Sequence, residues 1–443
     1  MGKRIAVIGT GYVGLVSGAC FAYLGHEVIG LDIDEEKIER LKKGEVPIYE
    51  PGLDKILASA LDAGRIEFTT DYSYAVRNSD FIFIAVGTPS RPDGSADLSY
   101  VESAYRSIAE NIGSGDYKVI VNKSTVPVGT GRWAKEFISK ILTERGIEEP
   151  EKRFDVVSNP EFLREGKAVE DFMNPDRVVV GADNREVAGM VASLYEKLQP
   201  AILITDLPTA EMIKYASNAF LATKISFINE IANICEKYGA DVTVVARGMG
   251  LDHRISPHFL RAGCGFGGSC FPKDVKALIH TGKVAGEDVE LLKSVISVNE
   301  RQKLKPVEKL LKHIPNLEGV KVALWGLAFK PETDDMREDP SIPIVKRLLE
   351  LGATVRAYDP VAVENAKRVF RKEMGKFGER LQFLADKYEA LEGADALILV
   401  TEWPEFRDVD FDKLKGKVVI DGRNLWEPSV MRQFCTYESI GRP

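Results

Sequence analysis

The sequence predicts an α/β protein with two doubly wound parallel sheets joined by a long central helix. Three observations lead to this fold class. Short apolar strands alternate with helical segments, this pattern occurs twice, and one long apolar helical stretch separates the two occurrences. Such alternation is typical of parallel sheets covered by helices on both faces. A chain of 443 residues is long enough for two or three domains with cores of their own.

The first half begins with a buried strand at residues 4–9 (RIAVIG), an apolar run without alternation. A glycine-rich turn and a small-residue segment through Gly25 follow it, which is typical of a parallel strand leading into a helix. Further strands are predicted at 26–32 (HEVIGLD), 79–89 (SDFIFIAVGTP) and 118–130 (KVIVNKSTVPVGT).

The second half repeats this order. An apolar strand opens at residues 320–326 (VKVALWG), then LGATVRAYDP echoes LGHEVIGLDID, and GADALILVTEW echoes NSDFIFIAVGT. Three echoes in one order indicate an internal repeat. The sequence therefore predicts two Rossmann-like domains.

Between the halves, residues 206–239 read as one helix that begins at an Asp206 cap, with Pro208 in its first turn, and ends at Gly239. Its length is roughly 50 Å and apolar residues cover most of its circumference. We expect a connecting spine whose uncovered surface packs on a second copy of the chain, forming a homodimer. The predicted division is 1–205, 206–315 and 316–443.

Gly9, Gly11 and Gly14 form GxGxxG between a strand and a helix, and Asp32 follows 18 residues beyond Gly14. These glycines permit a tight turn and close approach of the backbone to a pyrophosphate, and the helix N-terminus faces the anion. Asp32 would bind a ribose 2′-hydroxyl, which favours NAD over NADP, although Lys37 weakens that inference. The alternative, glycines that serve only a turn, is disfavoured by this placement.

The second half lacks the fingerprint, because its first strand is followed by WGLAFKPETDD with Gly326 alone and a lysine, Lys330. This loop suits the mononucleotide end of a larger substrate. It suits a purely structural duplicate equally well.

Residues 263–274 (GCGFGGSCFPKD) place four glycines before Cys270 and Pro272 after it, where a helix can begin. A helix N-terminus, with Lys273 nearby, stabilises a thiolate. A small buried thiol is the alternative, and we assign it to the four other cysteines. A nucleophilic thiolate beside NAD suggests that an aldehyde is captured as a thiohemiacetal, oxidised to a thioester and hydrolysed.

The composition of the chain argues against several classes of partner and of cellular location. The net charge of −8 argues against nucleic acid as a partner. Five scattered cysteines argue against a disulfide framework, and the short apolar runs argue against export or a membrane segment, so we expect a cytoplasmic protein. Scattered histidines and the absence of CxxC or HExxH predict no metal site.

Eight motifs in order resemble the UDP-glucose/GDP-mannose dehydrogenase family over the whole chain. They are GTGYVGL, YEPGL, KSTVPVGT, NPEFLREG, EMIKYASNAFLA with FINE, GFGGSCFPKD, FKPETDDMRE and DGRNLW. The resemblance implies oxidation of C6 of a nucleotide sugar to a carboxylate with two NAD⁺ in turn, and Cys270 matches the thioester cysteine. The FPKD segment looks more like the UDP-glucose branch.

The resemblance also implies roles for individual residues. Lys214 and Asn218, one helical turn apart, match the pair that stabilises the developing oxyanion. Asp274 matches a carboxylate that removes the alcohol proton with Thr125 and a water, and Glu161 matches the base of the hydrolysis step. Read without the family, these residues are a solvated helix face, a first-turn acid and an exposed loop acid.

The remaining matched positions bind cofactor or substrate. The cofactor positions are Tyr12, Val13, Asp32, Lys37, Thr88, Thr125, Glu165, Lys273 and Arg337. The substrate positions are Phe162, Leu163, Lys214, Asn218, Arg254, Phe259, Gly267, Phe329, Lys330 and Arg423, where Arg254 reaches the neighbouring subunit's site. The expected substrate is UDP-glucose. Alternatives are GDP-mannose or a UDP-N-acetylhexosamine, a nucleotide-sugar-binding regulator without activity, and a two-electron dehydrogenase.

Overall fold

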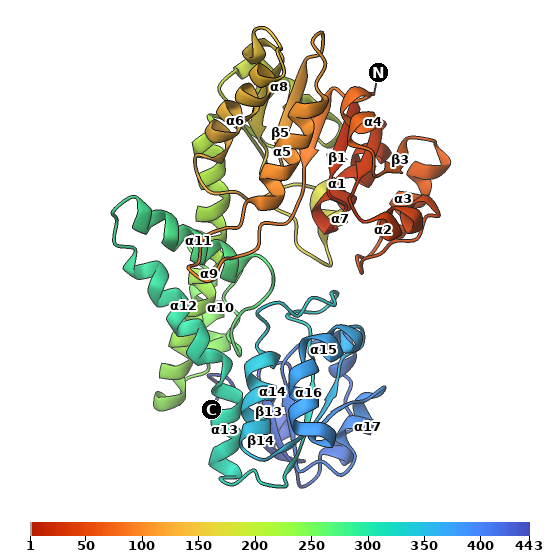
Figure 1. Cartoon of the computed structure of the whole chain (residues 1–443). Coiled ribbons are helices and arrows are strands. Elements are labelled where there is room, and N and C mark those ends of the chain that lie inside the picture. The colour runs from red at the N-terminus through yellow and green to blue at the C-terminus, as the bar shows by residue number, and fades with distance from the viewer. Residues whose placement is uncertain (1) are drawn as a thin grey trace. The chain divides into compact units, whose positions relative to one another are not determined.

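A long helix joins two α/β units in the computed structural model, which describes residues 2–443 (Figure 1). The units are Met1–Ser217 and Asn218–Pro443, and helix α9 (Leu207–Tyr238) runs from the first into the second. The predicted fold class, two doubly wound domains joined by a long helix, is therefore confirmed. The three-part division at residues 205 and 315 stays a prediction.

Within the described residues of the first unit, eight strands form one sheet in the order β3-β2-β1-β4-β5-β6-β7-β8. All neighbours are parallel except β6 and β7. The strands are β1 (Arg4–Ile8), β2 (Glu27–Leu31), β3 (Ile66–Thr69), β4 (Phe81–Ile84), β5 (Lys118–Asn122), β6 (Phe154–Ser158), β7 (Val178–Ala182) and β8 (Ile202–Thr205).

Helices cover both faces of this sheet. Ile5 and Val7 of β1 pack into a core with residues of α1 and α3, whereas Ala6 and Ile8 pack on the opposite face with residues of α5 and α6. Alternate side chains of a strand point to opposite faces, so a fully buried strand is apolar at every position. The helices are α1 (Tyr12–Tyr23), α2 (Glu35–Lys42), α3 (Leu53–Asp62), α4 (Tyr72–Arg77), α5 (Ser99–Asn111), α6 (Thr130–Glu144), α7 (Ala168–Met173) and α8 (Arg185–Ser193).

Six parallel strands form the sheet in the described part of the second unit, in the order β11-β10-β9-β12-β13-β14. The strands β10, β9 and β12 take the places that β2, β1 and β4 hold in the first sheet, which confirms the predicted repeat. The strands are β9 (Lys321–Trp325), β10 (Thr354–Tyr358), β11 (Leu381–Phe383), β12 (Ala396–Leu399), β13 (Val418–Asp421) and β14 (Thr436–Ser439).

A helical region follows α9 in the second unit, before its sheet. After α9, the helices of the second unit are α10 (Val242–Gly250), α11 (Phe271–Val284), α12 (Glu290–Lys303), α13 (Lys305–His313), α14 (Ser341–Glu350), α15 (Val363–Val369), α16 (Arg371–Phe377), α17 (Lys387–Leu391) and α18 (Pro428–Met431). Short 3-10 turns lie at Pro150–Lys152, Glu196–Leu198, Gly378–Arg380, Pro404–Phe406 and Phe411–Leu414. Buried apolar side chains of β9 and β12 lie in one large core that packs the C-terminal sheet against its helices.

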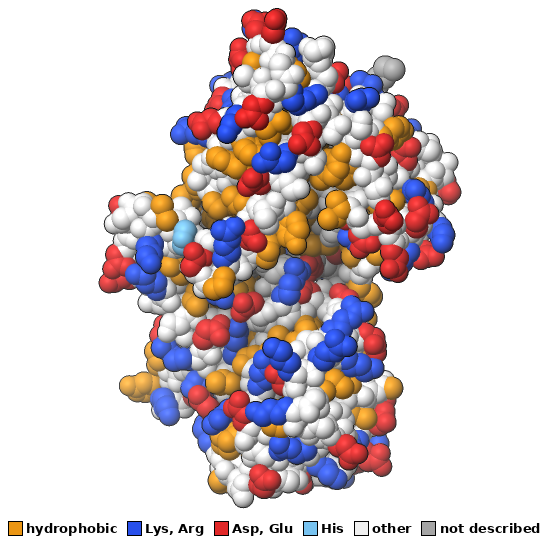
Figure 2. Space-filling view, viewed as in Figure 1, with side chains coloured by type: hydrophobic (Ala, Val, Ile, Leu, Met, Phe, Trp, Pro, Cys, Tyr) orange, Lys and Arg blue, Asp and Glu red, His pale blue; other side chains and the backbone are white. Residues whose placement is uncertain are grey.

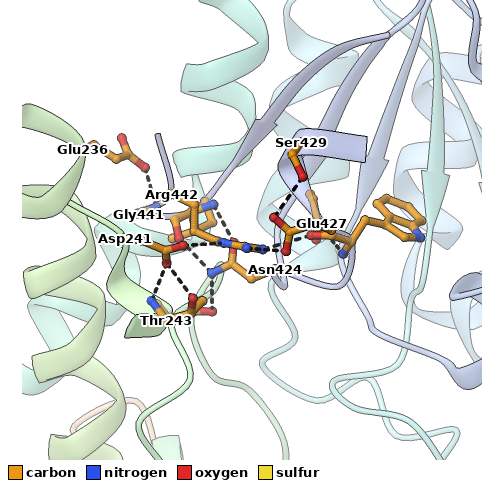
Figure 3. Close-up of polar contacts among 12 residues, drawn as sticks. Glu236, Asp241, Thr243, Asn424, Glu427, Ser429, Gly441 and Arg442 are labelled. Atoms are coloured by element: carbon orange, nitrogen blue, oxygen red, sulfur yellow. Dashed lines mark hydrogen bonds and ion pairs between the residues drawn. The ribbon is translucent and has the colours of Figure 1, made fainter. Parts of the chain in front are cut away.

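The C-terminal segment ties this helical region to the sheet (Figure 3). The Arg442 guanidinium lies 3.4 Å from Asp241 at the start of α10 and 2.9 Å from Glu427 in the loop after β13. The Gly441 amide donates to Glu236 of α9 over 2.8 Å. Asn424 exchanges two hydrogen bonds with the backbone of Ile440. These bonds fix the second half of α9 against the C-terminal sheet.

The start of α9 confirms the predicted cap, because the Asp206 carboxylate accepts the Thr209 amide over 2.8 Å. Both signs of charge appear on the visible face of each unit (Figure 2). Across residues 2–443, none of the helices combines the length and apolar character needed to cross a membrane.

Candidate active site

The loop between β1 and α1 lies where the strand order of the first sheet reverses, between β1 and β4. Gly9 has a φ of 92°, and a Cβ there would lie 2.6 Å from the Ala85 carbonyl oxygen. A Cβ on Gly14 would lie 1.8 Å from the Gly9 oxygen. A Cβ on Gly11 would meet nothing within 4 Å. Gly9 and Gly14 therefore permit the turn itself, and Gly11 leaves open space above it.

Helix α1 begins at this loop with Gly11 as its N-cap and without a side-chain cap. Uncapped amides at a helix N-terminus bind anions through their N–H groups and the helix dipole. The open space over Gly11 and the uncapped first turn therefore fit the pyrophosphate of NAD. In a bound state, these amides would hold the phosphates and Asp32 would hold the adenosine ribose.

Asp32 follows β2 and already accepts several hydrogen bonds. The Thr10 amide and hydroxyl donate to it over 2.9 and 2.8 Å, and Lys37 Nζ lies 2.9 Å away. Burial would raise the pKa of this carboxyl, but the hydrogen bonds from Thr10 and Lys37 outweigh burial and lower the pKa. Asp32 is therefore a carboxylate at neutral pH, as an acceptor for a ribose hydroxyl must be.

Other predicted cofactor positions meet around this loop. The Thr88 hydroxyl, after β4, donates to the Thr125 carbonyl oxygen, after β5, over 2.9 Å. The Tyr12 hydroxyl, in the first turn of α1, lies 3.4 Å from the Leu163 carbonyl oxygen. Val13 and Glu165 are half-buried. The carboxyl ends of parallel strands lie at one edge of the sheet, which is why distant motifs meet there.

Glu161 and Lys214 form a buried ion pair in the first unit. Lys214 Nζ lies 2.8 Å from Glu161 Oε1, and their side chains are only 4% and 5% exposed. The second oxygen, Oε2, accepts the Leu163 amide over 2.7 Å. Two cations lie near the Phe162 ring, Arg177 at 3.7 Å and Lys214 at 5.4 Å from its centroid. Glu161 is thus a held carboxylate, where the sequence alone suggested an exposed loop acid.

In the second unit, Cys270 is the N-cap residue of α11, and Pro272 lies in the first turn. This confirms the predicted helix start. The sulfur is half-buried and lies 3.5 Å from the Ser269 hydroxyl. Cys264, in the same loop, is fully buried, and burial raises the pKa of its thiol to about 11. Cys270 is the cysteine of this loop whose position favours a thiolate.

Asn218 and Asp274 also meet within the second unit. The Asn218 amide nitrogen donates to Asp274 Oδ2 over 2.6 Å, and Lys273 Nζ lies 2.7 Å from Asp274 Oδ1. Asp274 is buried in the first turn of α11. An amide nitrogen has two hydrogens, so Asp274 orients Asn218 and leaves one N–H for another acceptor.

The glycines before Cys270 lie against the carboxyl edge of the second sheet. A Cβ on Gly267 would lie 2.7 Å from the Glu338 oxygen, and one on Gly268 would lie 2.8 Å from the Phe329 ring. The Gly268 amide donates to the Arg337 oxygen over 2.7 Å. Arg423, after β13, donates to the Gly265 oxygen over 2.9 Å. Three predicted substrate or cofactor positions, Phe329, Arg337 and Arg423, therefore contact the loop that contains Gly267.

The other predicted substrate residues are less closely joined. Phe259 has a φ of 63°, and its ring centroid lies 6.0 Å from that of Phe271, the neighbour of Cys270. Arg254 is largely exposed and pairs with Asp252 over 2.6 Å. Lys330 Nζ lies 5.4 Å from the Phe329 ring centroid. Within residues 2–443, no group of three or more His, Cys, Asp or Glu side chains is arranged to hold a metal ion.

The sequence analysis did not single out two buried charged residues of the first unit, Glu211 and Lys123. Glu211 of α9 accepts the Gly129 and Gly131 amides at the start of α6, over 2.6 and 2.7 Å. Lys123, after β5, contacts Asn159 and Tyr195. A charged residue in an apolar helix and a lysine that ends an apolar strand are the signals that were available for Glu211 and Lys123.

The fold and these groups define an α/β dehydrogenase that binds a dinucleotide and carries a cysteine at a helix N-terminus. Family models agree: the NAD binding, central and UDP binding domains of the UDP-glucose/GDP-mannose dehydrogenase family match residues 3–199, 208–301 and 323–428. The chain belongs to this family.

Individual relatives cover the whole chain. UDP-glucose 6-dehydrogenase TuaD of Bacillus subtilis strain 168 is 49% identical over 100% of this chain and 94% of its own. UDP-glucose 6-dehydrogenase of Rhizobium meliloti strain 1021 is 48% identical over 99% of this chain and 100% of its own. The solved UDP-glucose dehydrogenase of Pyrobaculum islandicum has a TM-score of 0.92 and 41% identity, covering 100% of this chain and 98% of that one.

Proposed function

We propose that this chain is an NAD-dependent UDP-glucose 6-dehydrogenase, which oxidises the C6 alcohol of UDP-glucose through an aldehyde to the carboxylate of UDP-glucuronate. The observation that carries the substrate is the identity to UDP-glucose 6-dehydrogenases, 44 to 49% over nearly full length. Solved structures named for UDP-D-ManNAc and GDP-mannose dehydrogenases reach only 29% and 32%. The reaction removes four electrons, and NAD supplies the hydride acceptor for each two-electron step when it is bound.

Covalent chemistry is assigned to Cys270. Its thiolate attacks the aldehyde carbon, a C–S bond forms, and the carbonyl oxygen becomes the oxyanion of a thiohemiacetal. Loss of a second hydride converts this adduct into a thioester. Water then adds to the thioester carbon, the C–S bond breaks, and the sulfur leaves as a thiolate, which regenerates the enzyme. The position of Cys270 at the start of α11 supports this role.

Polar side chains are assigned to proton transfer or to stabilising the oxyanion in these steps. Asp274, with Thr125 and a water, accepts the proton of the C6 alcohol. Lys214 and Asn218 stabilise the oxyanion, and the orientation of the Asn218 amide by Asp274 supports this. Glu161 is the base that takes a proton from the hydrolytic water. Its ion pair with Lys214 supports a role as a carboxylate.

The first test counts NADH formed per UDP-glucose consumed, with the sugar limiting and NAD⁺ in excess. We expect two NADH per sugar. One NADH would indicate a two-electron dehydrogenase. No reduction would contradict the proposed substrate, and a panel of GDP-mannose and UDP-N-acetylhexosamines would then separate another nucleotide sugar from a binding protein without activity.

The Cys270→Ser variant tests the covalent step. We expect net turnover to be lost while NAD binding stays close to that of the unaltered protein, because Cys270 is not among the cofactor positions. Cys264→Ser, which changes the buried thiol of the same loop, is the matched control and should keep turnover. Full steady-state activity of Cys270→Ser would contradict the mechanism.

We also propose that the protein is a homodimer formed through α9. Phe220, Phe227 and Ile234 follow one another at seven-residue spacing and are 65%, 45% and 53% exposed in the single chain. A helix with exposed apolar side chains at this spacing is typical of packing on another helix. A second copy of the same helix would cover them across a two-fold axis.

Two further expectations belong to this proposal. We place the enzyme in the cytoplasm, because none of the cysteines of the described residues forms a disulfide. We also keep the division into an NAD-binding domain (1–205), a central helical region (206–315) and a UDP-sugar-binding domain (316–443).

A further inference from the structure

Lys123 is a buried lysine directly after β5, in the first unit. Its Nζ donates to Asn159 Oδ1 and to the Tyr195 hydroxyl oxygen, each over 3.1 Å. The Tyr195 hydroxyl in turn donates to Asn159 Oδ1 over 2.6 Å. These three side chains form a closed triangle of hydrogen bonds. Among the described residues, both hydrogen-bond partners of the Lys123 ammonium are neutral groups.

A buried ammonium with neutral partners is costly, because neutral oxygens replace water's solvation only in part. Burial lowers the pKa of Lys123 to about 7; the Glu161 carboxylate opposes this shift and the Lys214 ammonium adds to it. Lys123 therefore changes its charge near neutral pH, next to the ion pair of the candidate active site.

The triangle is also joined to that ion pair through the backbone. Asn159 lies two residues before Glu161, and its amide nitrogen atoms donate to the Asn122 and Val179 carbonyl oxygens, each over 2.8 Å. Asn159 is thus held on three sides, by β5, by β7 and by Lys123. The turn that carries Glu161 to Lys214 starts from this fixed residue.

We propose that Lys123 is a positioning residue for the Glu161–Lys214 pair, which it controls through Asn159 and through its own charge. This inference rests on the proposed function, in which Glu161 is the base of the hydrolysis step. Glu161 follows β6, Lys214 lies on α9 and Tyr195 follows α8, and these are the titratable groups that face Lys123.

The charge of Lys123 changes the strength of Glu161 as a base. The Lys123 ammonium places one positive charge beside the Glu161–Lys214 ion pair. When Lys123 loses its proton, the transfer of a proton from the hydrolytic water to Glu161 is opposed by one positive charge fewer. The rate of the hydrolysis step should therefore rise with pH through neutrality, with Lys123 as the group that titrates.

Lys118 supplies a matched control, because it lies at the other end of the same strand. It is buried like Lys123, and its Nζ donates to the Ser79 and Arg77 carbonyl oxygens over 2.7 and 3.4 Å, with Asp116 at 4.0 Å. Replacing either lysine by methionine removes a buried ammonium at one end of β5. Only Lys123→Met removes one beside Glu161.

The experiment compares Lys123→Met and Lys118→Met by their kcat and KM profiles from about pH 6 to pH 9. We expect Lys123→Met to lose or shift the acid limb of kcat by about one pH unit, with KM for NAD⁺ within about two-fold of the unaltered enzyme. Lys118→Met should change the thermal midpoint and leave the profile in place. Tyr195→Phe, which keeps the lysine and removes one acceptor, should shift the same limb by less.

Superimposable pH profiles for the two methionine variants would overturn the proposal.

Thermal unfolding without substrate tests the ionisation of Lys123 independently of the proposed function, and it can be measured even if a variant is inactive. Between pH 7 and about 10 the unfolded chain holds a proton that folded Lys123 has lost, so the unaltered protein gains stability with pH. Lys123→Met lacks this gain. If the thermal midpoints of the unaltered protein and of Lys123→Met depended on pH equally, the proposal would also be overturned. If UDP-glucose itself is not oxidised, the proposed function fails first, and the profiles are recorded with the nucleotide sugar that is.

Discussion

Gly11 and Gly14 lie three residues apart in one loop, yet a methyl group would have different effects at each. A Cβ on Gly14 collides with the Gly9 carbonyl oxygen at 1.8 Å, whereas one on Gly11 meets nothing within 4 Å. Gly14 is therefore required by the fold of the unbound chain. Gly11 is required by what approaches the loop from outside, which on this reading is the pyrophosphate of NAD.

This contrast predicts that Gly11→Ala folds normally but binds NAD weakly. We expect its dissociation constant for NAD to rise about ten-fold or more, because the methyl group occupies the phosphate cradle, while its thermal midpoint stays within about 2 °C. Gly14→Ala, the matched variant, should lower the thermal midpoint by several degrees, of the order typical of overpacking. Fluorescence titration with NAD and thermal unfolding measure both. Unaltered NAD affinity in Gly11→Ala would show that the cofactor does not approach there.

At the scale of elements, helix α9 contacts the start of α6 through a buried carboxylate. Glu211 accepts two amides of the α6 N-terminus, yet burial raises its pKa to about 7 even though these two hydrogen bonds oppose the shift. Between about pH 4.5 and pH 7 the folded chain therefore holds a proton that the unfolded chain has released. Stability falls as pH rises through this window.

Glu211→Gln removes that titration and so predicts a change in pH dependence. From pH 5 to pH 8, we expect the unaltered protein to lose about 1–3 kcal/mol of stability relative to the variant. Denaturant unfolding at the two pH values measures this difference in the free energy of unfolding. Glu136→Gln, on the exposed side of α6, is the control and should follow the unaltered protein at both pH values. A Glu211→Gln difference that is equal at pH 5 and pH 8 would refute the ionisation of this carboxyl.

The two sheets use an acidic residue after the second strand in different ways. Asp32 lies at the edge of the first sheet with a side chain that is 11% exposed. Its counterpart Asp359 is buried and accepts the Leu327 and Ala328 amides and the Trp403 indole N–H. Asp32 also accepts several hydrogen bonds, so the difference lies in exposure: as a whole residue, Asp359 is 2% exposed against 9% for Asp32, and a ribose cannot reach it. This contrast in exposure favours the first half as the dinucleotide site.

At the scale of the whole molecule, the proposed dimer predicts that the exposed face of α9 controls assembly. We expect the purified protein to sediment as a dimer, and Phe227→Glu to sediment as a monomer, since a buried unpaired charge at a helix interface costs several kcal/mol. Tyr100→Glu, on the similarly exposed surface of α5, should remain a dimer. A monomeric unaltered protein, or a dimeric Phe227→Glu, would contradict the proposed interface.

Local patterns in the sequence were sufficient for seven of the fourteen strands of the described residues (β1, β2, β4, β5, β9, β10 and β12), the repeat, the bounds of α9 and the helix start at Cys270. The other seven strands were not predicted. Each predicted feature depends on residues within a few positions of one another: an apolar run, a glycine in a turn, or a cap such as Asp206 followed by Pro208. Periodicity and turn chemistry are short-range properties. They can therefore be read along the chain, and they determined the fold class and the dinucleotide loop.

Tertiary structure alone decided which polar groups are buried and what they contact. Lys123 meets Tyr195 across 72 positions of sequence, Glu211 meets Gly129 across 82, and Arg423 meets Gly265 across 158. No local pattern marks these pairs. The cost of burying a charge depends on the partners that folding brings to it, so the charge states of this site follow from the packed sheets and not from the order of residues.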